Sequence, residues 1–410
     1  MARKSLFTIS LEDEDILDNV EATETIEVEE VVAAEEEQAE FQEAAEEVEE
    51  EVVALEESEE VVAELEEQAA TQEQIIEEKP EEITEDTVQI AQESFMCYAA
   101  KLGKTYEELK MRRISSETVT ASPVQAFKVS TEDIKEFAAK ALEMIKNLFA
   151  KIAASLKKLR AKFVVFMDRT AANALKLVNS YRSKKGDIKL SEEVSKKIIS
   201  KLPVMIAANG GKVDSSLLDF VQIDFVKDVV GGVKAGTSIE TPKFVNNAVH
   251  KKILDFVVKA GAENVTCVTQ AYKSTVTYVS AENGEVKTFE VTKDKFDGVK
   301  LSGLGSYREL AEILVKVARN GKENKKYADG LENSQKEVMK KAEEISKGGE
   351  DTAEARKQLR LLRSLGSKLV LDSIMQYVNV NKALVAICTT AGGQADSEEA
   401  GKAEAESEKK

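Results

Sequence analysis

The sequence predicts a mainly α-helical protein with an α+β part. We expect a disordered or marginally helical acidic N-terminal arm, a long basic amphipathic helix, and a helical body with a small β-hairpin. Three observations support this: acidic and basic residues are segregated, apolar residues recur at helical spacing, and one stretch alternates around an Asn-Gly pair. With 410 residues and 42% apolar content, the chain is long enough to bury a sizeable core.

The acidic and basic residues occupy different parts of the chain. Residues 1–117 contain about 38 acidic and about 8 basic residues, a net charge of about −30. Residues 118–395 contain about 32 acidic and about 46 basic residues, a net charge of about +14, and residues 396–410 contribute about −3. An acidic arm joined to a basic body indicates partners of opposite charge, or a change of partner over time.

The acidic arm is rich in Glu, Ala and Val, and charge repulsion opposes a compact core there. Some of its apolar residues nevertheless follow the three- and four-residue steps of a helical seam, which Glu59 interrupts. The seam consists of Phe41, Ala45, Val48, Val52, Leu55, Val62 and Ala69. We interpret the arm either as a solvated, marginal helix or as a coiled-coil helix that forms only against a basic partner. Pro80 is expected to end it.

Residues 118–129 read as a linker or an extended segment, because they combine Pro123 with small polar residues. Ser130 and Asp133 resemble a capping box, and from there an apolar stripe extends over about eight turns to Phe163. This predicts a long basic helix, followed by a separate helix over 170–182. The cations of the long helix are Lys135, Lys140, Lys146, Lys151, Lys157, Lys158, Arg160 and Lys162.

The basic helix has three interpretations. It is a solvated face over a packed stripe, a surface that contacts the phosphate backbone of nucleic acid without sequence preference, or an amphipathic helix at a membrane surface. No base-reading motif or aromatic stacking platform accompanies it, so sequence-specific recognition is not expected.

The remainder divides into an α+β region over 186–305, helices over 306–391 and a disordered tail over 392–410. Residues 204–208 are read as a possible strand. The Asn-Gly pair at 283–284 predicts a hairpin between residues 274–280 and 286–291. Residues 378–388 form either a helix end or a buried strand.

No catalytic constellation, metal site or cofactor is expected. The chain has one histidine, His250, which is read as a structural residue of a helix face, and three cysteines far apart in sequence. The Gly303-Leu304-Gly305-Ser306 segment precedes a helix and could hold an anion, but Arg308 stands where the third glycine of a dinucleotide fingerprint would be. We read it as a turn before the helix. An enzyme hidden within residues 204–305 is the disfavoured alternative.

The charge changes sign at Ser115-Ser116-Glu117, directly before Thr118. The acidic arm, the segment Ser94–Gly103, this junction and the segment Val129–Phe137 occur in an order that resembles the internal head (prohead core) proteins of large contractile-tailed bacteriophages. The resemblance covers residues 1 to about 165 and rests on architecture and short phrases. Residues 186–390 match only in their general helical character.

The resemblance implies assembly in the prohead core and trimming by a phage prohead protease after Glu, with a small or aliphatic residue two positions earlier. Ser115-Ser116-Glu117 fits that pattern, as do the segments that end at Glu12, Glu85 and Glu93. The mature body would stay inside the capsid with packaged DNA after assembly in the host cytoplasm. Its partners would be the protease, core, scaffold and capsid proteins, non-specific DNA and further copies of itself. The alternative function is an injected membrane-active effector that uses the helix at 134–163.

Overall fold

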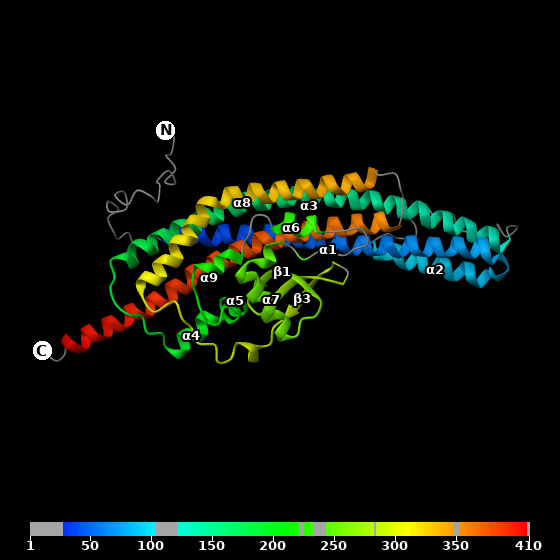
Figure 1. The fold of residues 1–410 in the computed structure, drawn as a ribbon. Helices are drawn as coiled ribbons and strands as arrows, with labels where there is room; N and C mark the ends of the chain where they lie inside the picture. The colour runs from blue at the N-terminus through cyan, green and yellow to red at the C-terminus, as the bar shows by residue number, and fades with distance from the viewer. Residues whose placement is uncertain are drawn as a thin grey trace, which may run out of the picture. The chain divides into compact units, whose positions relative to one another are not determined.

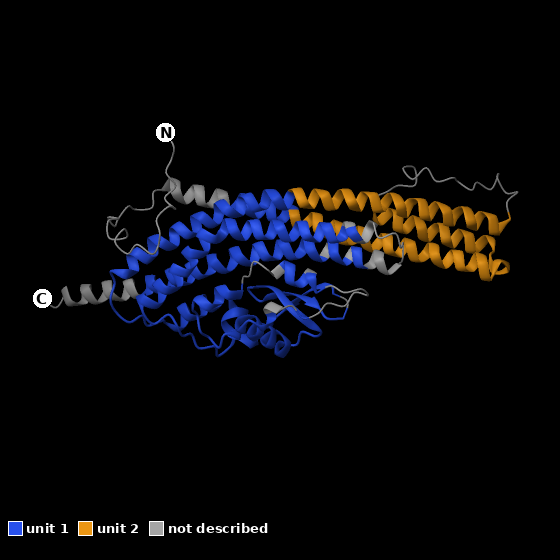
Figure 2. Cartoon of the chain, turned by 45° about the horizontal axis from the view of Figure 1, so that its top comes forward, with its two compact units in different colours: residues 1–47, 155–410 blue, residues 48–154 orange. Residues whose placement is uncertain are grey.

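The structure is a computed structural model that describes residues 28–102, 122–220, 225–232, 241, 243–282, 284–347 and 353–407. The chain forms two compact units, one of residues 1–47 and 155–410 and one of residues 48–154 (Figure 2). The fold is mainly α-helical with one small antiparallel sheet, as the sequence predicts (Figure 1).

The α-helices are α1 (Val28–Glu78), α2 (Glu85–Lys101), α3 (Pro123–Arg182), α4 (Glu192–Ile199), α5 (Pro203–Ala208), α6 (Phe225–Gly231), α7 (Ala248–Ala260), α8 (Tyr307–Lys347) and α9 (Ala353–Ser407). Short 3-10 turns are η3 (Pro80–Glu82), η5 (Ser215–Phe220), η6 (Lys243–Asn246) and η7 (Lys293–Phe296). The strands are β1 (Val265–Tyr272), β2 (Thr275–Ser280) and β3 (Val286–Glu290).

The unit of residues 48–154 consists of the C-terminal part of α1, all of α2, and the N-terminal part of α3. One of its cores combines residues of all three helices: Val61, Leu65, Ala69, Phe95, Ala99, Ile134, Phe137 and Ala138. In it, the rings of Phe95 and Phe137 meet edge to face with centroids 5.3 Å apart. The interpretation of the arm as a solvated helix is therefore wrong for this stretch, because α1 has a packed face. Every predicted seam residue is buried, and so is the interrupting Glu59.

The other unit has a larger core that joins α3, α8 and α9 to the sheet and the short helices. β2 pairs with β1 on one side and with β3 on the other, so β1 and β3 are the edge strands. Helix α9 covers the edge of β1, since the Ala271 amide donates to Gln376 Oε1 over 2.9 Å and the Thr269 hydroxyl donates to Asp372 Oδ2 over 2.8 Å. The predicted hairpin is confirmed as β2–β3, but β1 was missed.

Several predicted boundaries are wrong for one physical reason, which is that tertiary packing extends helices through weak local signals. Helix α3 begins at Pro123 and continues without a break to Arg182, so part of the predicted linker and the gap before residue 170 are helical. Ser130 is buried inside α3 rather than capping it. Residues 204–208 belong to helix α5, not to a strand.

The C-terminal part also departs from the prediction. Residues 378–388 lie inside α9, which settles the choice between a helix end and a strand. The helix then continues to Ser407, where the sequence predicts a disordered tail from residue 392. Ala391 is fully buried, and Gly392 packs against the Tyr181 ring, so this turn of α9 has tertiary contacts.

Candidate polyanion-binding surface on the basic helix

Helix α3 positions its lysines by an eleven-residue repeat that the sequence analysis missed. Because α-helical residues are about 100° apart, eleven residues complete three turns plus about 20°, and the members of such a set form a row. The lysines of α3 form two such rows, which are roughly 140° apart around the helix and flank the buried stripe on either side. Row A consists of Lys135, Lys146 and Lys157, and row B consists of Lys140, Lys151 and Lys162.

Row B is partly neutralised by α1, which runs antiparallel to α3. In one unit Glu51 Oε1 lies 3.0 Å from Lys151 Nζ, and in the other Glu40 Oε2 lies 3.4 Å from Lys162 Nζ. The two glutamates are also eleven residues apart. A third step along α1 reaches Val62, and Lys140 instead pairs with Glu136 of its own helix at 2.6 Å. At these two positions, the acidic arm therefore pairs with basic residues of its own chain.

Row A is more open. Lys135 pairs with Glu73 of α1. Lys146 and Lys157, together with the neighbouring Lys158, are exposed and form no ion pair within the described parts of the chain. These three ammonium groups are thus available to a phosphate backbone or another polyanion while α1 remains in place.

Arg160 was predicted to belong to the set of cations that face outward, and the structure contradicts this prediction. Its side chain is 8% exposed and lies 3.7 Å from Glu332 Oε2 of α8, so it does not face outward with the lysines. Burial lowers the pKa of its guanidinium, and the negative charge of Glu332 opposes that shift. The spacing of α3 carries the signal that was missed, because Arg160 lies eleven residues after the buried stripe residue Phe149 and so falls on nearly the same side of the helix.

The predicted cleavage residues Ser115, Ser116, Glu117 and Thr118 lie outside the described residues. Two other segments that fit the same protease pattern are described. Residues 83–85 lie at the start of α2, where the Thr84 side chain accepts from the Thr87 amide as an N-cap. Residues 91–93 lie within α2, with Ala91 buried in the core around Phe127.

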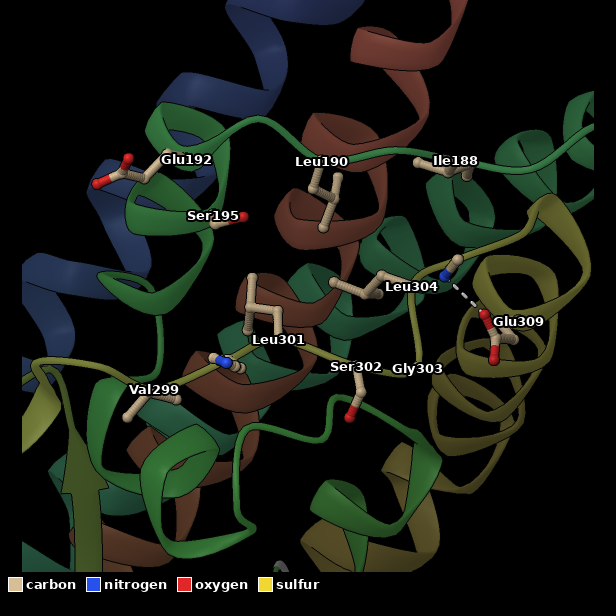
Figure 3. Close-up of a pocket in the computed structure, with 12 residues that line it drawn as sticks. Ile188, Leu190, Glu192, Ser195, Val299, Leu301, Ser302, Gly303, Leu304 and Glu309 are labelled. Carbon is tan, nitrogen blue, oxygen red and sulfur yellow. Dashed lines mark hydrogen bonds between the residues drawn. The ribbon is translucent and has the colours of Figure 1, made fainter.

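In the glycine-containing turn before α8, a carboxylate of the chain itself accepts a hydrogen bond from the backbone. The Gly305 amide donates to Glu309 Oε2 over 2.7 Å (Figure 3). The Glu309 amide in turn donates to Ser306 Oγ over 3.3 Å. These contacts satisfy the Gly305 amide just before the helix and the Glu309 amide of its first turn from within the chain. The turn lines a shallow pocket of about 580 Å³ that also includes Leu190, Ser195 and Leu301 (Figure 3). The reading of this segment as a structural turn therefore fits its geometry.

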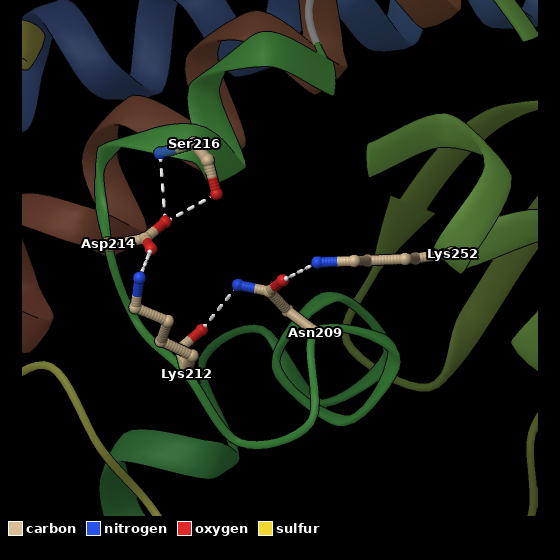
Figure 4. Close-up of polar contacts among 5 residues, drawn as sticks. All are labelled: Asn209, Lys212, Asp214, Ser216 and Lys252. Atoms are coloured by element: carbon tan, nitrogen blue, oxygen red, sulfur yellow. Dashed lines mark hydrogen bonds and ion pairs between the residues drawn. The ribbon is translucent and has the colours of Figure 1, made fainter. Parts of the chain in front are cut away.

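A polar network links α7 to the turn after α5. Lys252 Nζ donates to Asn209 Oδ1 over 2.9 Å, and Asn209 Nδ2 donates to the Lys212 carbonyl over 2.8 Å (Figure 4). Lys212 Nζ lies 2.6 Å from Asp214 Oδ2, and the other Asp214 oxygen accepts from the Ser216 amide (Figure 4). The ion pair and these hydrogen bonds lower the pKa of Asp214 although burial opposes them. The network fixes the chain before η5.

The residues that could carry chemistry are dispersed. His250 is buried and stacked on Phe220 with centroids 4.4 Å apart, and burial lowers its pKa to about 4. Burial raises the pKa of Cys267 and of Cys388 to about 12. Among the described residues, no group of three His, Cys, Asp or Glu side chains has the arrangement of a metal site. None of the described helices combines the length and the apolar character needed to cross a membrane.

Comparisons with known proteins add no relative. No family model matches the sequence, and no curated protein or solved structure is significantly similar to it.

Proposed function

We propose that this chain is an internal structural protein of a bacteriophage head. In this proposal a prohead protease cuts it after Glu117, and the basic body remains with packaged DNA inside the capsid. The observation that supports it most directly is the pairing of an acidic helix with a lysine-rich helix in one chain, through Glu51 and Lys151 and through Glu40 and Lys162. A chain built this way limits its own contact with nucleic acid until the acidic helix leaves.

The proposed DNA contact is electrostatic and independent of sequence. The exposed Lys146, Lys157 and Lys158 would contact phosphates first, and Lys135, Lys151 and Lys162 would join them once α1 and its glutamates are gone. Affinity should therefore fall steeply with salt concentration, since each neutralised phosphate releases counterions.

Particle composition tests the proposal as a whole. Mass spectrometry and N-terminal sequencing of the protein from purified particles should find a chain that begins at Thr118. A chain that still contains the acidic arm in mature particles would refute the processing step.

A charge-reversal experiment tests the DNA contact in the full chain. Replacing Lys146, Lys157 and Lys158 by Glu should weaken binding to duplex DNA and reduce its salt dependence. The control reverses Lys251, Lys259 and Lys300, which are exposed elsewhere and give the same net charge. Equal losses in both variants would mean that net charge, not the surface of α3, determines binding.

A second candidate is a membrane-active effector, and one observation favours it. The two lysine rows flank the apolar stripe of α3 on either side, which is the arrangement of a helix that lies at a lipid surface. The stripe is buried in the intact chain, so this function requires the covering helices to leave. Flotation with anionic liposomes, compared with neutral liposomes, separates this candidate from DNA retention.

A further inference from the structure

Non-covalent contacts, as well as the peptide chain, connect the acidic arm to the basic body. In the unit of residues 48–154, α1 and α2 come before the segment 103–121, and α3 follows it. Apolar contacts connect the two sides: Leu65 of α1 and Phe95 of α2 share a core with Ile134 and Phe137 of α3. A second core joins Ile83, Val88 and Ala91 to Phe127 of α3.

Polar contacts fix the register of the same surface. The Thr131 hydroxyl of α3 donates to Gln72 Oε1 of α1 over 2.8 Å, and both side chains are buried. The Glu51–Lys151 pair has its carboxylate 6% exposed, so it is partly removed from solvent screening. The buried Thr131–Gln72 pair specifies one alignment of the two helices.

The unit of residues 1–47 and 155–410 contains a separate part of the same contact. There Phe41 of α1 stacks on Phe166 of α3 with centroids 5.5 Å apart. Gln38 Oε1 also accepts from Lys382 Nζ of α9 over 2.6 Å.

We infer that the face of α3 covered by α1 and α2 is a docking surface for the chain's own acidic helices, and that this surface holds them after the backbone is cut between residues 102 and 122. Its partner chemistry is an amphipathic helix with an apolar seam and glutamates eleven residues apart. This deepens the proposed function, because cleavage alone would not release Lys151 and Lys162 from their ion pairs with α1. Separation of the acidic fragment is the step that would do so.

The experiment introduces a recognition sequence for a specific protease at residues 112–118 of the full chain and cuts it after folding. Size-exclusion chromatography at micromolar concentration should show both fragments in one peak, and denaturant should be needed to separate them. Co-elution should persist at 1 M salt, because exposed ion pairs contribute little and apolar contacts are not screened. Separation in dilute buffer, or on adding salt alone, would overturn the inference.

A matched pair of variants identifies the surface. Leu65→Asp places a charge in the core, and Ala70→Asp adds the same charge at an exposed position of the same helix. After cutting, Leu65→Asp should raise the dissociation constant of the fragment at least about a hundredfold, and Ala70→Asp should leave it nearly unchanged. Circular dichroism of each uncut variant shows whether its helices form. Equal constants in two folded variants would overturn the inference.

If Leu65→Asp does not fold, a second variant, Leu65→Ala, tests the same contact. Truncating this side chain weakens the contact without burying a charge. It should give a smaller rise in the dissociation constant than Leu65→Asp, and no rise would overturn the inference. These readouts do not involve DNA. The DNA-binding experiment on the lysines of α3 can therefore fail while the fragments stay together, and the two proposals fail separately.

Discussion

Thr131 of α3 donates a hydrogen bond to Gln72 of α1 in a position where both side chains are buried. Thr131 Oγ1 also lies 2.9 Å from the carbonyl of Phe127, one turn earlier. The acidic helix and the basic helix are thus aligned by a specific polar contact as well as by a general attraction of opposite charges.

Thr131→Val should destabilise the unit of residues 48–154 by about 1–3 kcal/mol, because the buried Gln72 oxygen loses this donor. Thr170→Val is the control, since Thr170 is buried on the same helix and its hydroxyl bonds the carbonyl four residues earlier. Its cost should be below about 1 kcal/mol. Urea unfolding followed by circular dichroism measures both, and equal costs would mean that Gln72 contributes nothing.

The apolar seam should contribute more stability than the surface ion pairs. Leu55 is fully buried, and Leu55→Ala should lower the free energy of unfolding by about 2–5 kcal/mol. Val53 is 44% exposed on the same helix, and Val53→Ala should cost far less. Lys135→Ala removes an exposed pair and should cost at most about 1 kcal/mol. A larger loss for Lys135→Ala than for Leu55→Ala would reverse this ranking.

Two adjacent glycines of α9 should respond to alanine with opposite signs. A Cβ at Gly392 would lie 2.6 Å from Tyr181 Cζ, whereas a Cβ at Gly393 would meet nothing within 4 Å. Gly392→Ala should therefore destabilise the protein by about 1–3 kcal/mol through overpacking. Gly393→Ala should stabilise it by up to about 1 kcal/mol through helix propensity. Thermal unfolding distinguishes them, and a stabilised Gly392→Ala would show that α9 does not pack there.

His250 should make the protein less stable as the pH falls. Its pKa is lowered from 6.5 to about 4 by burial, so the unfolded state binds the proton first. The stabilising contribution is complete above pH 6.5 and is lost as the pH falls toward 4, to a total of about 3 kcal/mol. Urea unfolding at several pH values should show a weaker dependence in His250→Phe over this range. An unchanged dependence in that variant would exclude the histidine as its source.

The sequence predicted features that depend on local patterns. The β2–β3 hairpin was predictable because an Asn-Gly pair and period-two alternation are local signals. The seam from Phe41 to Ala69 was predictable because helical spacing marks the packed face. Strand β1 was missed because its pairing with β2 and the cover from Asp372 and Gln376 depend on residues far away in sequence.

The sequence predicted which residues make up the candidate surface on α3, but it did not predict which of them form ion pairs with other helices. The eight basic residues between Lys135 and Lys162 of α3 were identified from the sequence, and the eleven-residue rows could have been found there by counting. The ion pairs of Lys151 and Lys162 with α1 could not, because their partners lie about a hundred residues or more away along the chain. Arg160 was misassigned because a charged residue beside an apolar stripe can point to either side of its edge.

The sequence by itself determined the helical class, the segregation of charge and the two-sided pattern of α3, since all three follow from residue type and periodicity. Only the tertiary structure decided which cations remain open and that the acidic helix packs onto the basic one. The reason is that exposure and charge pairing are properties of surfaces brought together by folding, and periodicity along one helix does not specify which surface covers it.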